Sequence, residues 1–370
     1  MFYFLNYIYI FTPFTTFTTF IIFLKITSFV FFFLNPKSRL YGDVFIKKRY
    51  GNLLNYKESV ICLNDLLYNN KIKLIAIDID GTLADDDGKI SDINLSAISL
   101  ASKLGLKVIL ATGRLHPYAM KMFTQSQIKN FNLEKMDGIY SHGAYAYLKG
   151  YKTILRKFSF FDLELILYAL SSHNVLENAV FLTVDSAYVL STNDEIQHED
   201  AYIDTDDELK IKSSIKYAKI NKKDYTPIVL NNVRDIFTIG DIISIEIYNQ
   251  LYANQDISNA ALNTLHAELD NYYKIYVPGS NNKLVLSPLN TSKIYGLNYI
   301  SKLYNIHVNE ILSIGNDTND IELLASTGYS VAVKNSTYGA LKVARCICTH
   351  TNNQNAIANI VYKTIKGKQI

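Results

Sequence analysis

Residues 74–82 read Leu-Ile-Ala-Ile-Asp-Ile-Asp-Gly-Thr, a short apolar run that ends in two aspartates, Asp78 and Asp80. An uninterrupted apolar run of this length is typical of a strand that is buried on both faces of a parallel sheet. Residues 91–104 follow with apolar side chains at helical spacing, and residues 106–111 form a second apolar run. Strand, helix and strand in close succession predict a βαβ unit and therefore an α/β fold.

The same alternation returns near the C-terminus. A helix, a strand, a short helix and a strand are predicted there over residues 292–304, 310–314, 320–326 and 329–333. Between the two α/β portions, residues 152–285 mix strand-like and helical stretches with polar, acidic linkers. We therefore predict a parallel-sheet core made of residues 71–151 and 286–370, with an α+β domain inserted at residues 152–285.

Composition and charge exclude some classes of protein. The 370-residue chain is 49% apolar and 19% charged, which is typical of a folded protein rather than a disordered one. Its net charge of +3 is small and no basic cluster is interleaved with aromatic residues, so we expect no nucleic-acid partner. Cys62, Cys346 and Cys348 cannot form a disulfide framework and lack a second pair of zinc ligands, so they are interpreted as small buried side chains.

Residues 1–70 are set apart from the folded domains. Residues 1–34 carry one charge, Lys25, and the uncharged residues 1–24 are long enough to cross a bilayer; residues 37–49 are basic. Three interpretations stay open. The segment is a membrane anchor, or a secretory signal with a basic leader to a plastid-like organelle, which we favour, or upstream sequence read into the frame of a cytoplasmic protein. Membrane association would run through residues 1–34.

The two aspartates predict a phosphate site with a metal ion. In open parallel sheets, ligands bind at the carboxyl ends of strands, where Asp78 and Asp80 are expected. Two carboxylates one residue apart repel each other unless a cation or a shared proton offsets their charge, and Mg²⁺ prefers oxygen ligands of this kind. Gly81 allows a tight turn, and the backbone and hydroxyl of Thr82 can face a phosphate. The alternative is an acidic turn without a ligand.

The sequence resembles the haloacid dehalogenase superfamily at four motifs in the same chain order. Residues 78–83 resemble the first motif, and residues 111–114, Ala-Thr-Gly-Arg, resemble the second. Lys293, at the start of a predicted helix, resembles the lysine of the third motif. Residues 315–320, Gly-Asn-Asp-Thr-Asn-Asp, resemble the fourth, which completes the metal site. The loop at Asn335 matches the Cof-type subfamily, and the insert has the position and size of that subfamily's large α/β cap of the C2 type.

The resemblance implies a Rossmann-like core and a Mg²⁺-dependent phosphatase that acts on sugar phosphates or other small phosphorylated metabolites. Asp78 would form an aspartyl-phosphate, Asp80 would act as general acid and base, and Lys293 would neutralise charge. The implied phosphate or substrate contacts are Gly81, Thr82, Thr112, Gly113, Arg114, Asn319 and His142. The implied metal ligands are Asp78, Asp80, Asn316, Asp317 and Asp320.

Two positions depart from the family pattern. Asn316 stands where relatives have a metal-binding aspartate, so Mg²⁺ affinity should fall, with Asp317 as a neighbouring carboxylate. His142 stands where relatives have asparagine; it either donates to the substrate or packs at a strand end. Asn316 keeps open an alternative, a catalytically weakened binding or regulatory protein that holds a phosphorylated ligand. A phosphomutase is a second alternative, and the oligomeric state stays open.

Overall fold

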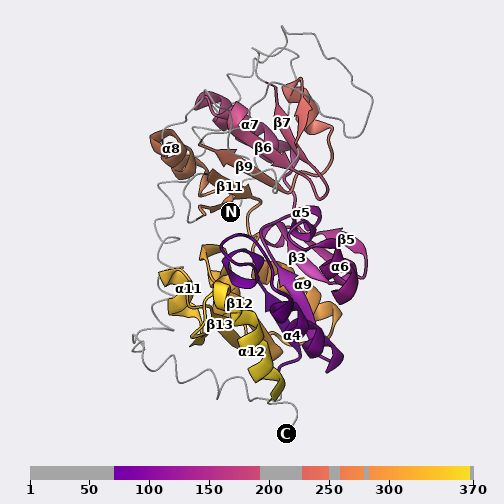
Figure 1. Ribbon diagram of the computed structural model, residues 1–370. Helices are drawn as coiled ribbons and strands as arrows, with labels where there is room; N and C mark the ends of the chain where they lie inside the picture. The colour runs from indigo at the N-terminus through magenta and orange to yellow at the C-terminus, as the bar shows by residue number, and fades with distance from the viewer. Residues whose placement is uncertain (1–70, 192–226, 250–258, 279–282, 367–370) are drawn as a thin grey trace, which may run out of the picture. The chain divides into compact units, whose positions relative to one another are not determined.

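The computed structural model describes residues 71–191, 227–249, 259–278 and 283–366 (Figure 1). These residues all belong to one compact unit, Tyr56–Ile370. Residues 1–70 lie outside the described residues, together with the expected anchor or leader and Cys62. No helix in the described ranges combines the length and the apolar character needed to cross a membrane.

Two sheets organise the described residues. The first has eight strands in the order β14-β13-β12-β1-β2-β3-β4-β5. Its strands are β1 (Leu74–Ile77), β2 (Lys107–Ala111), β3 (Gly138–Tyr140), β4 (Tyr145–Leu148), β5 (Tyr151–Ile154), β12 (Ile311–Gly315), β13 (Tyr329–Ala332) and β14 (Cys346–Ile347). The strands from β14 to β3 run parallel, and β4 and β5 add an antiparallel edge. This sheet is the core that the sequence predicts.

The second sheet, which we call the cap sheet, has six strands in the order β10-β11-β9-β6-β7-β8. They are β6 (Ala179–Leu182), β7 (Ala187–Leu190), β8 (Ile228–Leu230), β9 (Ser244–Tyr248), β10 (Lys274–Tyr276) and β11 (Lys283–Ser287). The helices are α4 (Asp92–Lys103), α5 (His116–Met120), α6 (Gln125–Phe131), α7 (Phe160–Ser172), α8 (Asn259–Leu269), α9 (Lys293–Leu303), α10 (Ile321–Ser326), α11 (Tyr338–Val343) and α12 (Ala356–Lys366).

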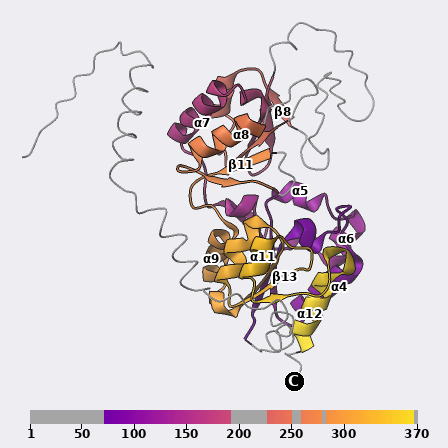
Figure 2. The same cartoon turned by 90° about the vertical axis from the view of Figure 1, so that its left-hand side faces the viewer.

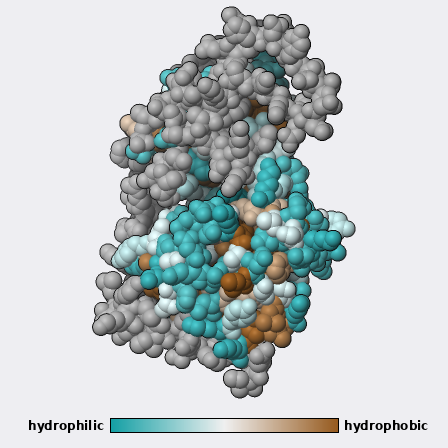
Figure 3. Space-filling view, in the orientation of Figure 1, coloured by the Kyte–Doolittle hydropathy of each residue, from teal (hydrophilic) through white to brown (hydrophobic). Residues whose placement is uncertain are grey.

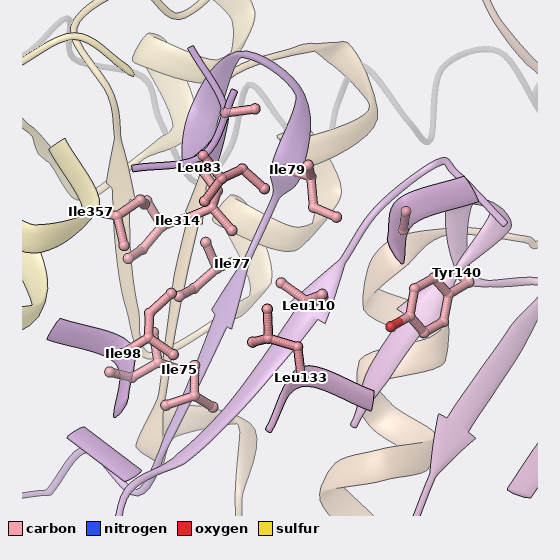
Figure 4. Packing of buried hydrophobic residues seen from close by; sticks show 14 of the residues in the cluster. Ile75, Ile77, Ile79, Leu83, Ile98, Leu110, Leu133, Tyr140, Ile314 and Ile357 are labelled. Carbon is pink, nitrogen blue, oxygen red and sulfur yellow. The ribbon is translucent and has the colours of Figure 1, made fainter. Parts of the chain in front are cut away.

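Strand β1 lies at the centre of the core sheet and is apolar on both faces. Ile75 and Ile77 point into a cluster that includes residues of α4 and α12, as Figure 4 shows for Ile98 and Ile357. Leu74 and Ala76 point to the other face, into a cluster with residues of α9 and α10. Successive side chains of a strand point to opposite faces, so a continuous apolar run is what a sheet covered on both sides requires.

The cap sheet is covered on one face by α7 and α8, which lie side by side in Figure 2. Ile245 and Ile247 of β9 and Leu284 and Leu286 of β11 point to that face and pack in one apolar cluster with side chains of both helices. The opposite face carries the polar Glu246 and Lys283 together with the apolar Val180 and Leu182. Figure 3 shows that the visible face of the core is mostly hydrophilic, with apolar residues in small separate patches.

The predicted α/β core with an inserted α+β domain is confirmed. The helix predicted at residues 91–104 is α4, and that predicted at residues 292–304 is α9. The first part of the core extends past residue 151, because β5 pairs with β4 through Ile154. The cap sheet extends past residue 285, because β11 continues to Ser287. Cys346 and Cys348 are both buried, as expected of small core side chains.

Candidate active site

Three loops that follow neighbouring strands meet at one edge of the core sheet. Asp78 follows β1, Thr112 follows β2 and Asn316 follows β12. The three strands are adjacent in the order β12-β1-β2 and run parallel, so their carboxyl ends lie at the same edge. The backbone N–H of Asp78 still donates to Ile314 O at 3.0 Å, which fixes the start of its loop against β12. The sheet topology therefore brings together residues that are far apart in the sequence.

Lys293 bridges two carboxylates in the interior. Its Nζ donates to Asp78 Oδ1 at 2.6 Å and to Asp320 Oδ1 at 2.8 Å. The three side chains are at most 5% exposed. Lys293 is the first residue of α9, and the Ser292 side chain caps that helix by accepting from the backbone N–H of Tyr295. The start of α9 therefore places the lysine next to the end of β1.

In this group of two carboxylates and one ammonium, the negative charges outnumber the positive one. Burial raises the pKa of Asp78 to about 7, with a further contribution from the charge of Asp320. Burial pushes the pKa of Lys293 down, but the charges of Asp320 and Asp78 more than offset it and raise that pKa above its ordinary value. A cation beside Asp78 would therefore favour its ionised form, which is the form a nucleophilic carboxylate needs.

Asp320 acts as a positioning residue. Its Oδ1 accepts from Lys293, and its Oδ2 accepts from the backbone N–H groups of Asn316 at 2.9 Å and Asp317 at 3.2 Å. The carboxylate packs against Gly315, where a Cβ would collide with it. Through these three hydrogen bonds Asp320 orients Lys293 and the 315–317 loop, and its role as a metal ligand stays a prediction.

Asn316 and Asp317 face different partners. The Oδ1 atom of Asn316 accepts from the Thr82 hydroxyl at 3.0 Å, and the amide lies against Gly81, whose φ of +71° and missing Cβ make room for it. Asp317 Oδ1 instead accepts from the backbone N–H of Thr318 at 2.7 Å, where it begins a helical turn. In this arrangement Asp317 begins the helical turn, and its compensation for Asn316, which requires a shift of the loop, stays a prediction.

Thr112, Gly113 and His142 form the next part of the site. The Thr112 hydroxyl oxygen accepts from the backbone N–H of Arg114 at 3.1 Å, so its hydrogen is left to donate, and Thr112 is fully buried. The ring of His142 packs on Gly113, where a side chain would collide with it. Its Nδ1 lies 3.3 Å from Asn319 Nδ2. Burial, reinforced by the charge of Lys293, lowers the pKa of His142 to about 3, so the ring is neutral.

Asp80 is the exposed carboxylate of the site. Its side chain is 50% exposed, and Arg114 binds it through Nη2 at 2.8 Å from Oδ1 and Nε at 2.9 Å from Oδ2. Asp80, Gly81 and Arg114 line a hollow of about 640 Å³, with Lys89 and Lys121 among its other walls. A carboxylate at the border of an open hollow is accessible to a leaving group and to water, unlike the buried Asp78.

The family model for haloacid dehalogenase-like hydrolases matches residues 75–361. The chain belongs to the haloacid dehalogenase-like hydrolase family. The matched range includes every catalytic, phosphate-contact and metal-site residue that the sequence motifs indicate. The expected membership of the superfamily is therefore confirmed, and with it the expectation of a hydrolase.

Similar proteins support this haloacid dehalogenase-like assignment along most of the chain. Phosphatase YwpJ of Bacillus subtilis is 24% identical over 294 residues, which cover 78% of this chain and 99% of the relative. The 5-amino-6-(5-phospho-D-ribitylamino)uracil phosphatase YitU of the same organism is 25% identical and covers 78% and 96%. A HAD/COF-like hydrolase structure from Plasmodium vivax has a TM-score of 0.68, is 24% identical and covers 82% and 99%. The phosphatase names agree with the predicted enzyme class, and the structural match confirms the fold.

The haloacid dehalogenase-like site fits Mg²⁺ with few ligands from the protein. Within the described ranges, no group of three or more His, Cys, Asp and Glu side chains converges as a metal site. Asp317 and Asp320 are held by helix-start and loop hydrogen bonds, and Asp80 by Arg114. Asp78 and Asn316, whose loops follow adjacent strands, offer a carboxylate and an amide oxygen, and each side chain also accepts one hydrogen bond. Mg²⁺ is commonly held by one or two carboxylates plus water and substrate phosphate, so this donor set suits it.

The sequence motifs of this haloacid dehalogenase-like hydrolase do not reveal two contacts at the site. One is the ion pair between Arg114 and Asp80. The other is Tyr276 of the cap sheet, whose ring stacks on His142 with centroids 4.6 Å apart and whose hydroxyl donates to Thr291 O at 3.0 Å. Tyr276 lies in a three-residue strand, and so short a stretch carries no periodic pattern that could have indicated it.

Proposed function

We propose that the chain is a Mg²⁺-dependent phosphatase that hydrolyses small phosphomonoesters through an aspartyl-phosphate on Asp78. The observation that carries the proposal is the geometry around Asp78, which ends the central strand, is bound to Lys293 at 2.6 Å and stands two residues before the exposed Asp80. A buried carboxylate with an adjacent lysine suits attack on phosphorus, and an exposed carboxylate suits proton transfer.

In the first step, an Asp78 oxygen bonds to phosphorus while the bond between phosphorus and the ester oxygen breaks. Protonated Asp80 gives its proton to that oxygen, and the alcohol leaves. In the second step, water attacks the aspartyl-phosphate and Asp80 takes its proton. The bond from phosphorus to Asp78 breaks, which releases inorganic phosphate and restores the Asp78 carboxylate.

The other residues would bind the phosphoryl group or hold the nucleophile. Lys293 keeps Asp78 in place, and the Thr112 hydroxyl and the backbone N–H of Thr82 can donate to phosphoryl oxygens. Arg114 can contact the phosphoryl group once it releases Asp80. Mg²⁺, held by Asp78 and Asn316, would supply positive charge to Asp78 and the phosphoryl oxygens. For that reason the raised pKa of Asp78 is compatible with a nucleophilic role.

Full-chain protein assayed with p-nitrophenyl phosphate and a panel of sugar and polyol phosphates, with and without Mg²⁺, tests the proposal. The panel includes 5-amino-6-(5-phospho-D-ribitylamino)uracil, the substrate in the name of YitU. We expect Mg²⁺-dependent release of inorganic phosphate that Asp78→Asn abolishes. Turnover no greater than that of the Asp78→Asn variant on every substrate would refute the enzyme.

Asn316 stands where a carboxylate is expected. This supports a second candidate function, a binding or regulatory protein that holds a phosphorylated ligand. The amide oxygen of Asn316 accepts from Thr82 and brings no charge to the metal. Binding of a phosphate ester from the panel, measured by calorimetry without turnover, would favour this candidate.

A phosphomutase is a further alternative. Phosphate that remains on the sugar at a new position, with no inorganic phosphate released, would indicate this activity instead.

A further inference from the structure

One face of the cap sheet carries a charged cluster of Glu246, Tyr248 and Lys283. Glu246 and Tyr248 are alternate residues of β9, and Lys283 of β11 is the cross-strand partner of Tyr248. Cross-strand partners and alternate residues share a face, so the three side chains lie together. They lie on the opposite face from the apolar side chains that pack under α7 and α8.

The cluster is tightly hydrogen-bonded around one carboxylate oxygen. Glu246 Oε2 accepts from Lys283 Nζ at 2.8 Å and from the Tyr248 hydroxyl at 2.6 Å. The Lys283 ammonium also lies 5.1 Å from the centre of the Tyr248 ring. The side chain of Glu246 is 5% exposed and that of Lys283 is 20% exposed. Lys283 is therefore the charged group that a ligand can reach, and Glu246 and Tyr248 set its orientation.

The same face of the cap sheet contacts the active site. Val285 of β11 pairs with Glu246 on one side and with Tyr276 of β10 on the other, so Tyr276 and Glu246 lie in one row across three strands. Tyr276 stacks on His142 and donates to Thr291 O, beside the start of α9. In addition, the charge of Lys283 contributes to the lowered pKa of His142, which places the ammonium within electrostatic range of the site.

A buried ion pair adds little stability to the pairing of two strands. Removing two charges from water costs about as much as their attraction returns, and apolar pairs of similar size are often as stable or more stable. The apolar residues on the other face of β9 and β11 show that these strands accept such pairs. A hydrogen-bonded Glu, Tyr and Lys on the face next to the active site is thus better explained by recognition of a ligand.

We propose that Lys283, oriented by Glu246 and Tyr248, determines substrate specificity by donating a hydrogen bond to a neutral oxygen on the leaving group. This inference rests on the proposed phosphatase function. Glu246 cancels the charge of Lys283, so the cluster favours a hydroxyl or carbonyl oxygen over a second anionic group. An apolar leaving group would offer the ammonium no acceptor beyond Glu246 and Tyr248, so it would gain nothing from Lys283. Lys283 is then a specificity-determining residue, and Glu246 and Tyr248 are positioning residues.

The experiment compares kcat/KM of full-chain variants on three kinds of substrate. Phenyl phosphate has no oxygen on its leaving group beyond the ester, ribitol 5-phosphate and glucose 6-phosphate carry neutral hydroxyls, and fructose 1,6-bisphosphate carries a second anion. For Lys283→Met we expect the loss on the hydroxylated esters to exceed the loss on phenyl phosphate by roughly 10-fold or more, the effect of losing a charged hydrogen bond.

Glu246→Gln tests the positioning role with a readout that a purely structural role would not change. The variant leaves Lys283 with a net positive charge, so the kcat/KM ratio of the bisphosphate to glucose 6-phosphate should rise roughly 10-fold. If either single variant folds poorly, the double variant Glu246→Gln/Lys283→Met removes both charges and should show the same selective loss as Lys283→Met. The matched control is Lys157→Met/Asp241→Asn, which removes an exposed ion pair of 2.7 Å elsewhere in the insert.

Each outcome separates the inference from the proposed function. Selective loss on the hydroxylated esters, absent from the control, supports the specificity role. Equal losses on phenyl phosphate and on the hydroxylated esters overturn it while the phosphatase stands. A wild-type protein that hydrolyses phenyl phosphate or the bisphosphate but no hydroxylated monoester refutes the neutral-oxygen preference. A wild-type protein without Asp78-dependent turnover on any substrate refutes the proposed function itself.

Discussion

Arg114 holds the carboxylate of Asp80 in a two-pronged ion pair, with Nη2 at 2.8 Å from Oδ1 and Nε at 2.9 Å from Oδ2. The pair joins the loop after β1 to the loop after β2 at the border of the open hollow. On the proposed mechanism, an arriving phosphoryl group would compete with Asp80 for the guanidinium. Its binding would therefore free the carboxylate for proton transfer at the moment when the substrate is in place.

Arg114→Lys tests this exchange. Lysine keeps the charge but lacks the planar fork that binds a carboxylate or a phosphate through two nitrogens. We expect kcat/KM for p-nitrophenyl phosphate to fall about 10-fold, chiefly through a higher KM. The melting temperature should change little, since a partly exposed ion pair contributes about 1 kcal/mol or less. Arg234→Lys, at an exposed position, is the matched control. An unchanged KM would show that Arg114 does not bind the phosphoryl group.

Lys293→Met should destabilise the fold as well as abolish turnover. The substitution leaves Asp78 and Asp320 facing each other in the interior without a cation, and breaking a buried ion pair from one side costs about 3 kcal/mol or more. Urea unfolding at pH 7, without added metal, measures the loss. Lys293→Met/Asp320→Asn removes one of the stranded charges, so it should be more stable than Lys293→Met alone. If the loss of unfolding free energy in the double variant equals the sum of the losses in Lys293→Met and Asp320→Asn, this explanation is contradicted.

Asn316→Asp should strengthen the binding of Mg²⁺. The new carboxylate can still accept from the Thr82 hydroxyl, as the amide oxygen does at 3.0 Å, and it adds a negative charge next to Asp78. We expect the Mg²⁺ concentration at half-saturation to fall about 10-fold, in line with about 1.4 kcal/mol of added attraction. The Mg²⁺-dependent rise in melting temperature measures this apart from activity. Asp317→Asn should shift the half-saturation less, because Asp317 begins a helical turn. Equal half-saturation in the Asn316→Asp variant and the wild type would exclude Asn316 from the metal site.

The chemistry of the core was predictable because it lies at the ends of strongly patterned elements. Asp78, Thr112 and Asn316 each follow an apolar strand, and in a parallel sheet such ends must share an edge. Lys293 was predictable from its place at a helix start. The separate roles of the aspartates at the site were not predictable. That Asp320 accepts from the backbone N–H groups of Asn316 and Asp317 depends on loop geometry that residue spacing does not express.

In the cap, the positions of the strands were more predictable than the pairing between them. The apolar side chains of β9 and β11 indicated strands, yet the partner of each strand depends on long-range pairing, and β10 is only three residues long. Glu246 and Lys283 are far apart in the sequence, and only the register between β9 and β11 brings them together. The tyrosine ring on His142 also depends on that sheet order.

His142 should make the protein less stable as the pH falls. Its pKa of about 3 in the folded state lies below the ordinary value of 6.5, with burial as the main cause and the charges of Lys293 and Lys283 as further ones; the ring of Tyr276 and the amide of Asn319 complete its surroundings. Below pH 6.5 the unfolded chain takes up a proton that the folded protein refuses. The free energy of unfolding should therefore drop by about 2 kcal/mol between pH 7 and pH 5 on account of this residue.

His142→Asn separates this contribution from all the others. Asparagine tolerates the positive φ of 56° at this position and does not titrate, whereas His116, whose pKa burial lowers to about 4, is present in both proteins and cancels in the difference. Urea unfolding at pH 7 and pH 5 should show that the variant loses about 2 kcal/mol less than the wild type. Identical losses in the two proteins would mean that His142 is protonated in the folded state at pH 5.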